Sequence, residues 1–331
     1  MATKKFWEAN LNRMKIIKKI LTIIFRVGIS ILLLYFIFRQ VDETSLLAIV
    51  SRADVPLLLL AAGIFFLNYF LCFFRWEMIL KTLEVNLPWK KLLVPFTGGI
   101  FFNLFLPSTI GGDFVRSVDL AVHTKKTKEV VASVFLDRLS GYIGLVVITL
   151  IALLCGWGVI RDKSVLSAIA LITGILGLIL LVLFNNFIFS NVNKMLDSPR
   201  AGRIRESLKD LHEEIYYFKG NKRVIVYNLL ISIVIQAISP LTFYVISRAL
   251  GLNVNILYFF IFLPVIGAIT LLPISIGGLG VREMTIVFFF AKVGVSKDIA
   301  FAMSLLNSLF MVVFAGIGGL IYVLTIRRRR V

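Results

Sequence analysis

The stretch LPSTIGGDFVR at residues 106–116 returns as LPISIGGLGVR at residues 272–282. Seven positions of the two copies agree without a gap, 166 residues apart in a chain of 331. Each copy lies in an apolar stretch whose helix a proline and a glycine pair are expected to interrupt. Interrupted apolar segments at matching places in two halves are typical of a membrane transporter's binding site. The alternative is two unrelated helix-breaking turns, and the arginine that recurs at the same spacing counts against it.

The composition predicts an all-α polytopic membrane protein. Apolar residues make up 59% of the chain, and the mean hydropathy is +0.94. A helix needs about 20 apolar residues to cross about 30 Å of hydrocarbon. Six stretches exceed that length: 17–40, 56–80, 130–156, 165–190, 224–250 and 299–326. Two further stretches, 92–112 and 257–280, contain the repeated motif and are expected to form re-entrant helical hairpins.

The net charge of +18 is best explained by membrane topology. If the N-terminus is cytoplasmic and each motif stretch returns to its starting side, 25 of the 36 Lys and Arg residues face the cytoplasm and eight face outward. Basic residues accumulate on the cytoplasmic side of membrane proteins. Making both motif stretches full crossings reverses this bias. We therefore expect a multi-pass protein of the cell inner membrane, with both termini cytoplasmic and no nucleic-acid partner.

This topology divides a single transmembrane domain, 1–331, into two halves with the same order of elements and opposite directions. The first pseudo-repeat covers about 17–156 and the second about 165–326. Such an inverted repeat relates the halves by an approximate two-fold axis in the membrane plane. Non-helical backbone at membrane depth needs protein or water to satisfy it. The two glycine-pair turns are therefore expected to meet inside the protein.

Three segments lie outside the repeat argument. Residues 191–223 have apolar positions at helical spacing, which predicts an amphipathic helix on the cytoplasmic surface. Residues 1–19 are basic, and the apolar stretch after them is too long for a signal peptide, so we expect a retained first helix. Cys72 and Cys155 fall within spans and are expected to be inert packing residues.

Polar residues around the two motifs are the candidates for substrate binding. A helix that starts after Gly112 directs N–H groups and the positive end of its dipole at the turn, which suits phosphate. Arg116 and Arg282 add planar, permanently charged guanidinium groups at equivalent positions. The structural alternative is that these arginines snorkel to the headgroup region or pair with Asp113 and Glu283.

Ionisable residues inside the spans extend this set. Asp137 and Arg138 lie in the span 130–156, where charged groups must be paired or hydrated, and they could pair with Asp113, Arg116 or each other. Arg75 and Trp76 lie near the inner end of the second span, where an interfacial anchor is expected. The candidate substrate-binding residues are Asn103, Pro107, Gly111, Gly112, Asp113, Arg116, Asp137, Arg138, Pro273, Ser275, Gly277, Gly278, Arg282 and Glu283.

Several signals are missing from the sequence. It has no GxxxxGK[ST] nucleotide cradle, no cluster with metal-ligand spacing and no Ser/His/Asp set. No catalytic residue, metal or cofactor is therefore predicted, and transport driven by ATP on this chain alone is not expected.

The chain resembles the transmembrane region of lysylphosphatidylglycerol synthases, a family that also occurs as stand-alone, flippase-like proteins. The resemblance covers nearly the whole chain. It depends on Asn103-Leu-Phe-Leu-Pro107 with Gly111-Gly112-Asp113 and Arg116, then on Asp137-Arg138, and more weakly on Pro273, Gly277-Gly278 and Arg282-Glu283. In the full synthases this region resembles a lipid flippase, and a separate soluble domain transfers the aminoacyl group. We expect no such domain to follow the last span, so the resemblance implies lipid translocation without lipid aminoacylation.

Three functions remain open. The first is a transporter that moves an anionic or phosphate-bearing (glyco)lipid between leaflets by alternating access. The second is a membrane transferase acting on a polyprenyl phosphate or phospholipid, with Asp113 or Asp137 as acid or base. The third is a scaffold for envelope-biosynthesis enzymes. The expected partners are a membrane lipid and, in addition, a second copy of the chain or those enzymes.

Overall fold

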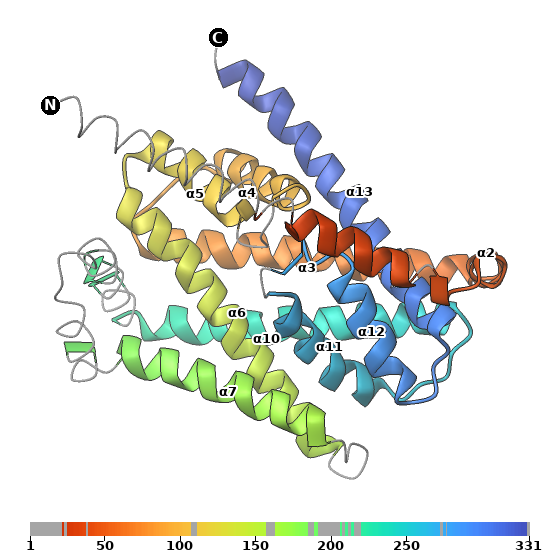
Figure 1. Ribbon diagram of the computed structural model, residues 1–331. Helices are drawn as coiled ribbons and strands as arrows, with labels where there is room; N and C mark the ends of the chain where they lie inside the picture. The colour runs from red at the N-terminus through yellow and green to blue at the C-terminus, as the bar shows by residue number, and fades with distance from the viewer. Residues whose placement is uncertain are drawn as a thin grey trace, which may run out of the picture.

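The computed structural model describes residues 22, 25–37, 39–106, 111–156, 163–184, 189–190, 206, 209–210, 213–214, 220–271, 274–275 and 277–329. These residues form helices and no strand (Figure 1). Five helices are long and apolar enough to cross a membrane: α3 (Val55–Thr82), α6 (Thr127–Cys155), α7 (Lys163–Phe184), α10 (Lys222–Ala249) and α13 (Lys297–Arg329). The predicted fold class, an all-α polytopic membrane protein, is confirmed.

The remaining described helices are shorter. They are an apolar helix over Phe25–Ile37, α2 (Glu43–Ser51), α4 (Trp89–Asn103), α5 (Gly111–Thr124), α11 (Ile256–Thr270) and α12 (Val281–Ala291). Of the predicted first span, 17–40, the described part holds the apolar helix Phe25–Ile37, which is too short to be one of the five, and residues 17–21, 23–24 and 38 lie outside the described residues. Most of the predicted surface helix at 191–223 also lies outside them. Of the latter, Asp210 is described, and it accepts a hydrogen bond from Lys128 Nζ at 2.8 Å.

Local sequence explains where the helices begin. Asp54 caps α3, since its Oδ1 accepts from the N–H of Leu57 at 3.0 Å, and Pro56 occupies the first turn. Asn255 caps α11 in the same way, accepting from Leu257 N at 3.0 Å. The residues directly before α3 and α11 therefore determine where each helix begins.

Helices α4 and α5 form one hairpin, and α11 and α12 form another. The helices have 15, 14, 15 and 11 residues, so each is at most about 22 Å long and too short to cross the hydrocarbon. The chain leaves helical geometry at residues 104–106 and again at 277–280. The two predicted breaks at the motifs are therefore present, while residues 107–110, 272–273 and 276 lie outside the described residues.

The two glycine pairs act differently, which corrects one prediction. Gly277 and Gly278 lie in the turn with φ of 58° and 78°, a region that favours glycine. Gly111 and Gly112, expected in the turn, are instead the first residues of α5. A Cβ on Gly112 would overlap the carbonyl oxygen of Gly99 on α4. In the first hairpin, glycine therefore allows two helices to approach closely.

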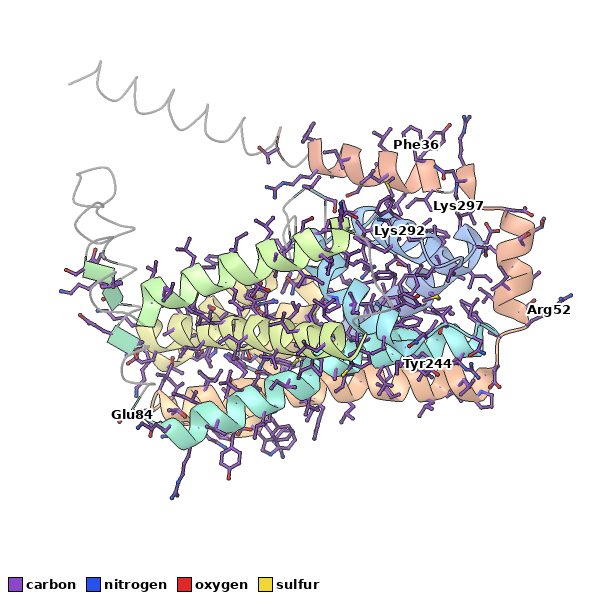
Figure 2. The ribbon with its side chains drawn as sticks, turned by 90° about the horizontal axis from the view of Figure 1, so that it is seen from below. Phe36, Arg52, Glu84, Tyr244, Lys292 and Lys297 are labelled. Atoms are coloured by element: carbon purple, nitrogen blue, oxygen red, sulfur yellow. The ribbon has the colours of Figure 1, made fainter. Side chains whose placement is uncertain are left out.

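The hairpins start from opposite ends of the helix bundle. The N–H of Asp54, before α3, donates to the carbonyl of Ala249, at the end of α10, so these helices run antiparallel. The first hairpin follows α3 and the second follows α10. Figure 2 shows Glu84, near the base of the first hairpin, and Lys292, at the base of the second, toward opposite ends.

Helix pairings recur between the halves. The pair α5–α6 corresponds to α12–α13, α4–α13 to α11–α6, and α3–α4 to α10–α11. These pairings agree with an inverted repeat. The repeat itself and the orientation of the halves relative to a membrane stay predictions.

Candidate functional site

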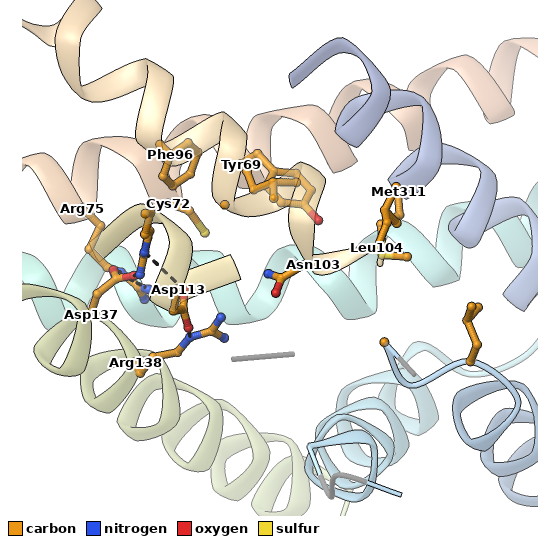
Figure 3. A pocket seen from close by; sticks show the side chains of 15 residues that line it. Tyr69, Cys72, Arg75, Phe96, Asn103, Leu104, Asp113, Asp137, Arg138 and Met311 are labelled. Atoms are coloured by element: carbon orange, nitrogen blue, oxygen red, sulfur yellow. Dashed lines mark hydrogen bonds and ion pairs between the residues drawn. The ribbon is translucent and has the colours of Figure 1, made fainter. Parts of the chain in front are cut away.

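The tips of the two hairpins meet at a cavity of about 300 Å³ (Figure 3). A Cβ on Gly277, at the second tip, would lie 3.5 Å from the carbonyl oxygen of Asn103, at the first. Its lining comes from five helices and the two tips. Helix α3 contributes Tyr69, Cys72 and Arg75, α4 contributes Phe96, Gly99, Ile100 and Asn103, α5 contributes Asp113 and Arg116, and α6 contributes Asp137 and Arg138. Leu104 after α4, Gly277 and Leu279 before α12, and Met311 of α13 complete it. We call it the first cavity.

Five charged side chains on three helices form one chain of ion pairs along this cavity. Arg75 and Arg116 each bond a different oxygen of Asp137, at 2.8 and 2.9 Å. Arg116 Nε also lies 3.2 Å from Asp113 Oδ1, and Arg138 Nε donates to Asp113 Oδ2 at 2.6 Å. Each carboxylate thus lies between two guanidinium groups, which offsets the large cost of burying either charge.

The pairing of Asp137 and Arg138 with the first motif confirms one alternative that the sequence left open. Both bond residues of α5 and not each other. Arg138 is the most exposed member, with 38% of its side chain accessible, against 6% for Arg116.

Arg75 and Trp76 belong to this site, and the prediction of an interfacial anchor was wrong. Arg75 is buried and donates to Ser232 on α10 at 3.1 Å as well as to Asp137. Trp76 is fully buried, its indole N–H donates to Ser133, and the Arg116 guanidinium lies 4.8 Å from its ring centroid. The sequence reading missed Arg75, although the need of the span carboxylate Asp137 for a counter-charge is a signal that could have identified it.

The N-terminus of α5 differs from the expected phosphate cradle. The N–H of Gly112 donates to Asn103 Oδ1 at 2.7 Å, so the side chain that ends α4 caps α5. Asp113 adds a negative charge in the first turn, where it complements the helix dipole. The arginines, more than the backbone N–H groups, therefore provide the positive charge of the first cavity.

The second motif places Arg282 at a different cavity. Arg282 lies 2.9 Å from Glu283 Oε1 and donates to Ser308 on α13 at 2.6 Å. The other oxygen of Glu283 accepts from the N–H of Gly280 at 2.6 Å and so closes the start of α12. The structure does not bring Arg116 and Arg282 into one cavity.

Arg282 lines a second cavity of about 260 Å³, which we call the second cavity. Tyr69 and Met311 line both cavities. Met311 Sδ lies 3.9 Å from a guanidinium nitrogen of Arg282. A flexible thioether and an aromatic ring therefore separate the two arginine-bearing spaces.

The other predicted site residues divide into three groups. Gly278 belongs to the second tip, near Thr270, and Gly111 packs on Leu106. Ser275 is 3% exposed, and its hydroxyl has no hydrogen-bond partner among the described residues. Pro107 and Pro273 lie outside the described residues.

The similarity to known proteins extends over most of the chain. The model of the lysylphosphatidylglycerol synthase TM region family matches residues 23–319. A UPF0104 membrane protein of Pyrococcus horikoshii is 24% identical over 315 residues, covering 88% of this chain and 92% of its own. Two UPF0104 membrane proteins of Methanothermobacter thermautotrophicus are 25% and 26% identical, over 82% and 75% of this chain and 86% and 77% of theirs. No solved structure matches.

Proposed function

We propose, from the premise that this chain belongs to the lysylphosphatidylglycerol synthase TM region family, that it is a lipid flippase. Its substrate is a phosphate-bearing lipid, and its headgroup site is the first cavity. The observation that carries this proposal is the buried chain of three arginines and two aspartates where the hairpin tips meet.

The charge of the first cavity supports a phosphate ligand. Three guanidinium groups and two carboxylates leave one positive charge in excess. Guanidinium groups match the geometry of phosphate oxygens and keep their charge at any physiological pH. A lipid phosphate that enters this cavity would neutralise the excess charge, whereas a cation would add to it.

The second cavity supports alternating access. Its Arg282 occupies the position in the second motif that Arg116 occupies in the first, and among the described residues Tyr69 and Met311 alone line both spaces. We therefore propose that the two arginines contact the phosphate in succession. The hairpins, which start from opposite ends of the bundle, would open the cavities to opposite sides.

A transporter is favoured over a transferase because of how the carboxylates are held. A general base needs a carboxylate oxygen that is within reach of the substrate and able to take a proton. Asp113 and Asp137 are buried, and both carboxylate oxygens of each are bonded to arginines. Neither residue therefore presents an unpaired oxygen to a substrate.

We place the protein in the inner membrane with both termini in the cytoplasm. The support is the bias of basic residues toward the cytoplasm, which is 24 against seven once Arg116 and Arg282, which line the cavities, are left out of the 25 and eight. The bases of the two hairpins, at Glu84 and Lys292, lie toward opposite ends of the bundle, which agrees with this arrangement.

The test is lipid translocation by the purified protein in vesicles, read from the fraction of acyl-labelled phosphatidylglycerol that a membrane-impermeant reductant reaches. Vesicles with protein should expose both leaflets, and protein-free vesicles only the outer one. Arg116→Ala and Arg282→Ala should each slow translocation at least about tenfold, since a charge-assisted hydrogen bond contributes about 1.5–3 kcal/mol.

Arg116→Lys and Arg282→Lys keep the charge but lose the planar fork, so they should impair transport more than folding. Arg52→Ala is the matched control, because Arg52 is exposed at the end of α2. Monodispersity in detergent reports folding. A well-folded Arg116→Ala or Arg282→Ala protein that translocates at the wild-type rate contradicts the proposed role of that arginine.

A further inference from the structure

The second cavity differs in chemistry from the first. Arg282 is the one charged side chain in its described lining, and the remaining polar side chains are amides and hydroxyls: Asn68, Tyr69, Ser239, Thr242, Thr270 and Asn307. Phe65 and Phe243 add aromatic surface. Since Arg282 is paired with Glu283 at 2.9 Å, the space offers neutral polar groups more than charge.

Several of these groups are left with capacity to accept hydrogen bonds. Asn68 Oδ1 is buried and has no partner among the described residues. The hydroxyls of Thr242 and Thr270 donate to Ile238 O and Gly267 O in their own helices, which leaves their oxygens as acceptors. A buried acceptor without a partner has lost its hydrogen bond to water, so a ligand that donates hydrogen bonds here is stabilised. Hydroxyl groups are such donors.

A cationic headgroup does not fit the second cavity. The described lining contains no carboxylate, and it does contain the Arg282 guanidinium. An ammonium group would lose its water and find no carboxylate in this lining to pair with, since Glu283 already pairs with Arg282 and accepts from the N–H of Gly280. Uncharged hydroxyls meet none of these costs.

The two cavities fit two parts of one headgroup. A phosphodiester carries one negative charge, which equals the excess positive charge of the first cavity. Met311 lines both cavities and is unbranched, so rotation about its side-chain bonds can join them. With the phosphate among Arg75, Arg116 and Arg138, the part of the headgroup beyond the phosphate would reach the second cavity.

We infer that the lipid carried is a phosphodiester whose headgroup beyond the phosphate is uncharged and rich in hydroxyls, such as a glycerol, inositol or sugar, and that aminoacylated, cationic lipids are rejected. This inference rests on the proposed function, because it names the substrate class of the same site. The juxtaposition that carries it is a singly positive arginine cavity beside a neutral amide and hydroxyl cavity without a carboxylate.

The test compares headgroups in the vesicle assay with the wild-type full-length chain. Acyl-labelled phosphatidylglycerol and phosphatidylinositol should cross at least about tenfold faster than lysyl-phosphatidylglycerol, a ratio that one uncompensated buried charge is sufficient to produce. Equal rates for all three lipids, or a faster rate for the lysyl lipid, overturn the inference and leave the flippase proposal standing. Translocation of no lipid above the protein-free rate ends both.

A charge added to the second cavity tests the cause of the selectivity. Asn68→Asp places a carboxylate at the unpartnered amide, where it can pair with the lysyl ammonium group. The ratio of the lysyl-phosphatidylglycerol rate to the phosphatidylinositol rate should therefore rise several-fold. Asn307→Asp does the same from α13 and serves if the first variant does not fold. Asn86→Asp, in the exposed loop after α3, is the matched control and should leave the ratio unchanged. An unchanged ratio in both well-folded cavity variants contradicts the inference.

Discussion

At the scale of single residues, the site is an alternation of charge: Arg75, Asp137, Arg116, Asp113 and Arg138. The sequence predicted four of these five, because ionisable residues within spans must find partners. It missed Arg75, since Arg-Trp near the end of a span is also the pattern of an interfacial anchor. The spacing of residues along one helix cannot show that Ser232, on a helix 157 positions away, supports the same arginine.

Replacing the two aspartates should have unequal effects on stability. Asp137→Asn leaves Arg75 and Arg116 buried without their shared carboxylate, which should cost about 3–5 kcal/mol. Asp113→Asn should cost less, about 1–3 kcal/mol, because water can solvate the partly exposed Arg138. Unfolding of the purified variants in detergent by heat, read by circular dichroism, measures the order. A larger loss of thermal stability for Asp113→Asn than for Asp137→Asn would contradict this order.

At the scale of helices and hairpins, hydropathy predicted five spans to within a few residues, because length and apolar content determine what can cross a membrane. It also predicted where the two hairpins turn. It did not separate the roles of the two glycine pairs, since a glycine that permits a positive φ and a glycine that permits close packing look the same in a sequence. Gly277 and Gly278 are of the first kind, and Gly112 is of the second.

Gly112→Ala should open the first hairpin. Its Cβ would overlap the backbone of α4 at Gly99, and overpacking of this kind costs about 1–3 kcal/mol. Gly174→Ala in α7 is the matched control, because nothing lies within 4 Å of a Cβ there. It should be neutral or slightly stabilising, since alanine is the better helix former. Thermal unfolding of both variants makes the comparison, and equal midpoints would refute the close approach of α4 and α5.

The bases of the two hairpins should face opposite sides of the membrane. Val122 and Ser296 are both exposed, near the end of α5 and just after α12. In a chain without Cys72 and Cys155, Val122→Cys should react with an impermeant thiol reagent added from the cytoplasmic side, and Ser296→Cys with the reagent added outside. Labelling of both from one side contradicts the inverted arrangement.

At the scale of the whole molecule, antiparallel α3 and α10 direct the hairpins inward from opposite ends, and the tips share a charged cavity. The sequence predicted that the two tips meet inside the protein, because non-helical backbone groups without hydrogen bonds cannot face lipid. It could not predict that the equivalent arginines line separate cavities, because that depends on how Tyr69 and Met311 pack between them. Under the proposed transport function, this arrangement gives a path with two arginine positions, along which the tips would move apart.

The most direct test of this account is to tether the hairpin tips and measure transport. Leu104→Cys and Leu279→Cys, both in the lining of the first cavity, can be joined by a short, reducible thiol cross-linker in a chain without Cys72 and Cys155. If the lipid headgroup passes between the tips, cross-linked protein in vesicles should stop translocating phosphatidylglycerol, reduction should restore the rate, and each single-cysteine variant should be unaffected by the reagent. Translocation by fully cross-linked protein at the rate of the reduced protein would contradict the account.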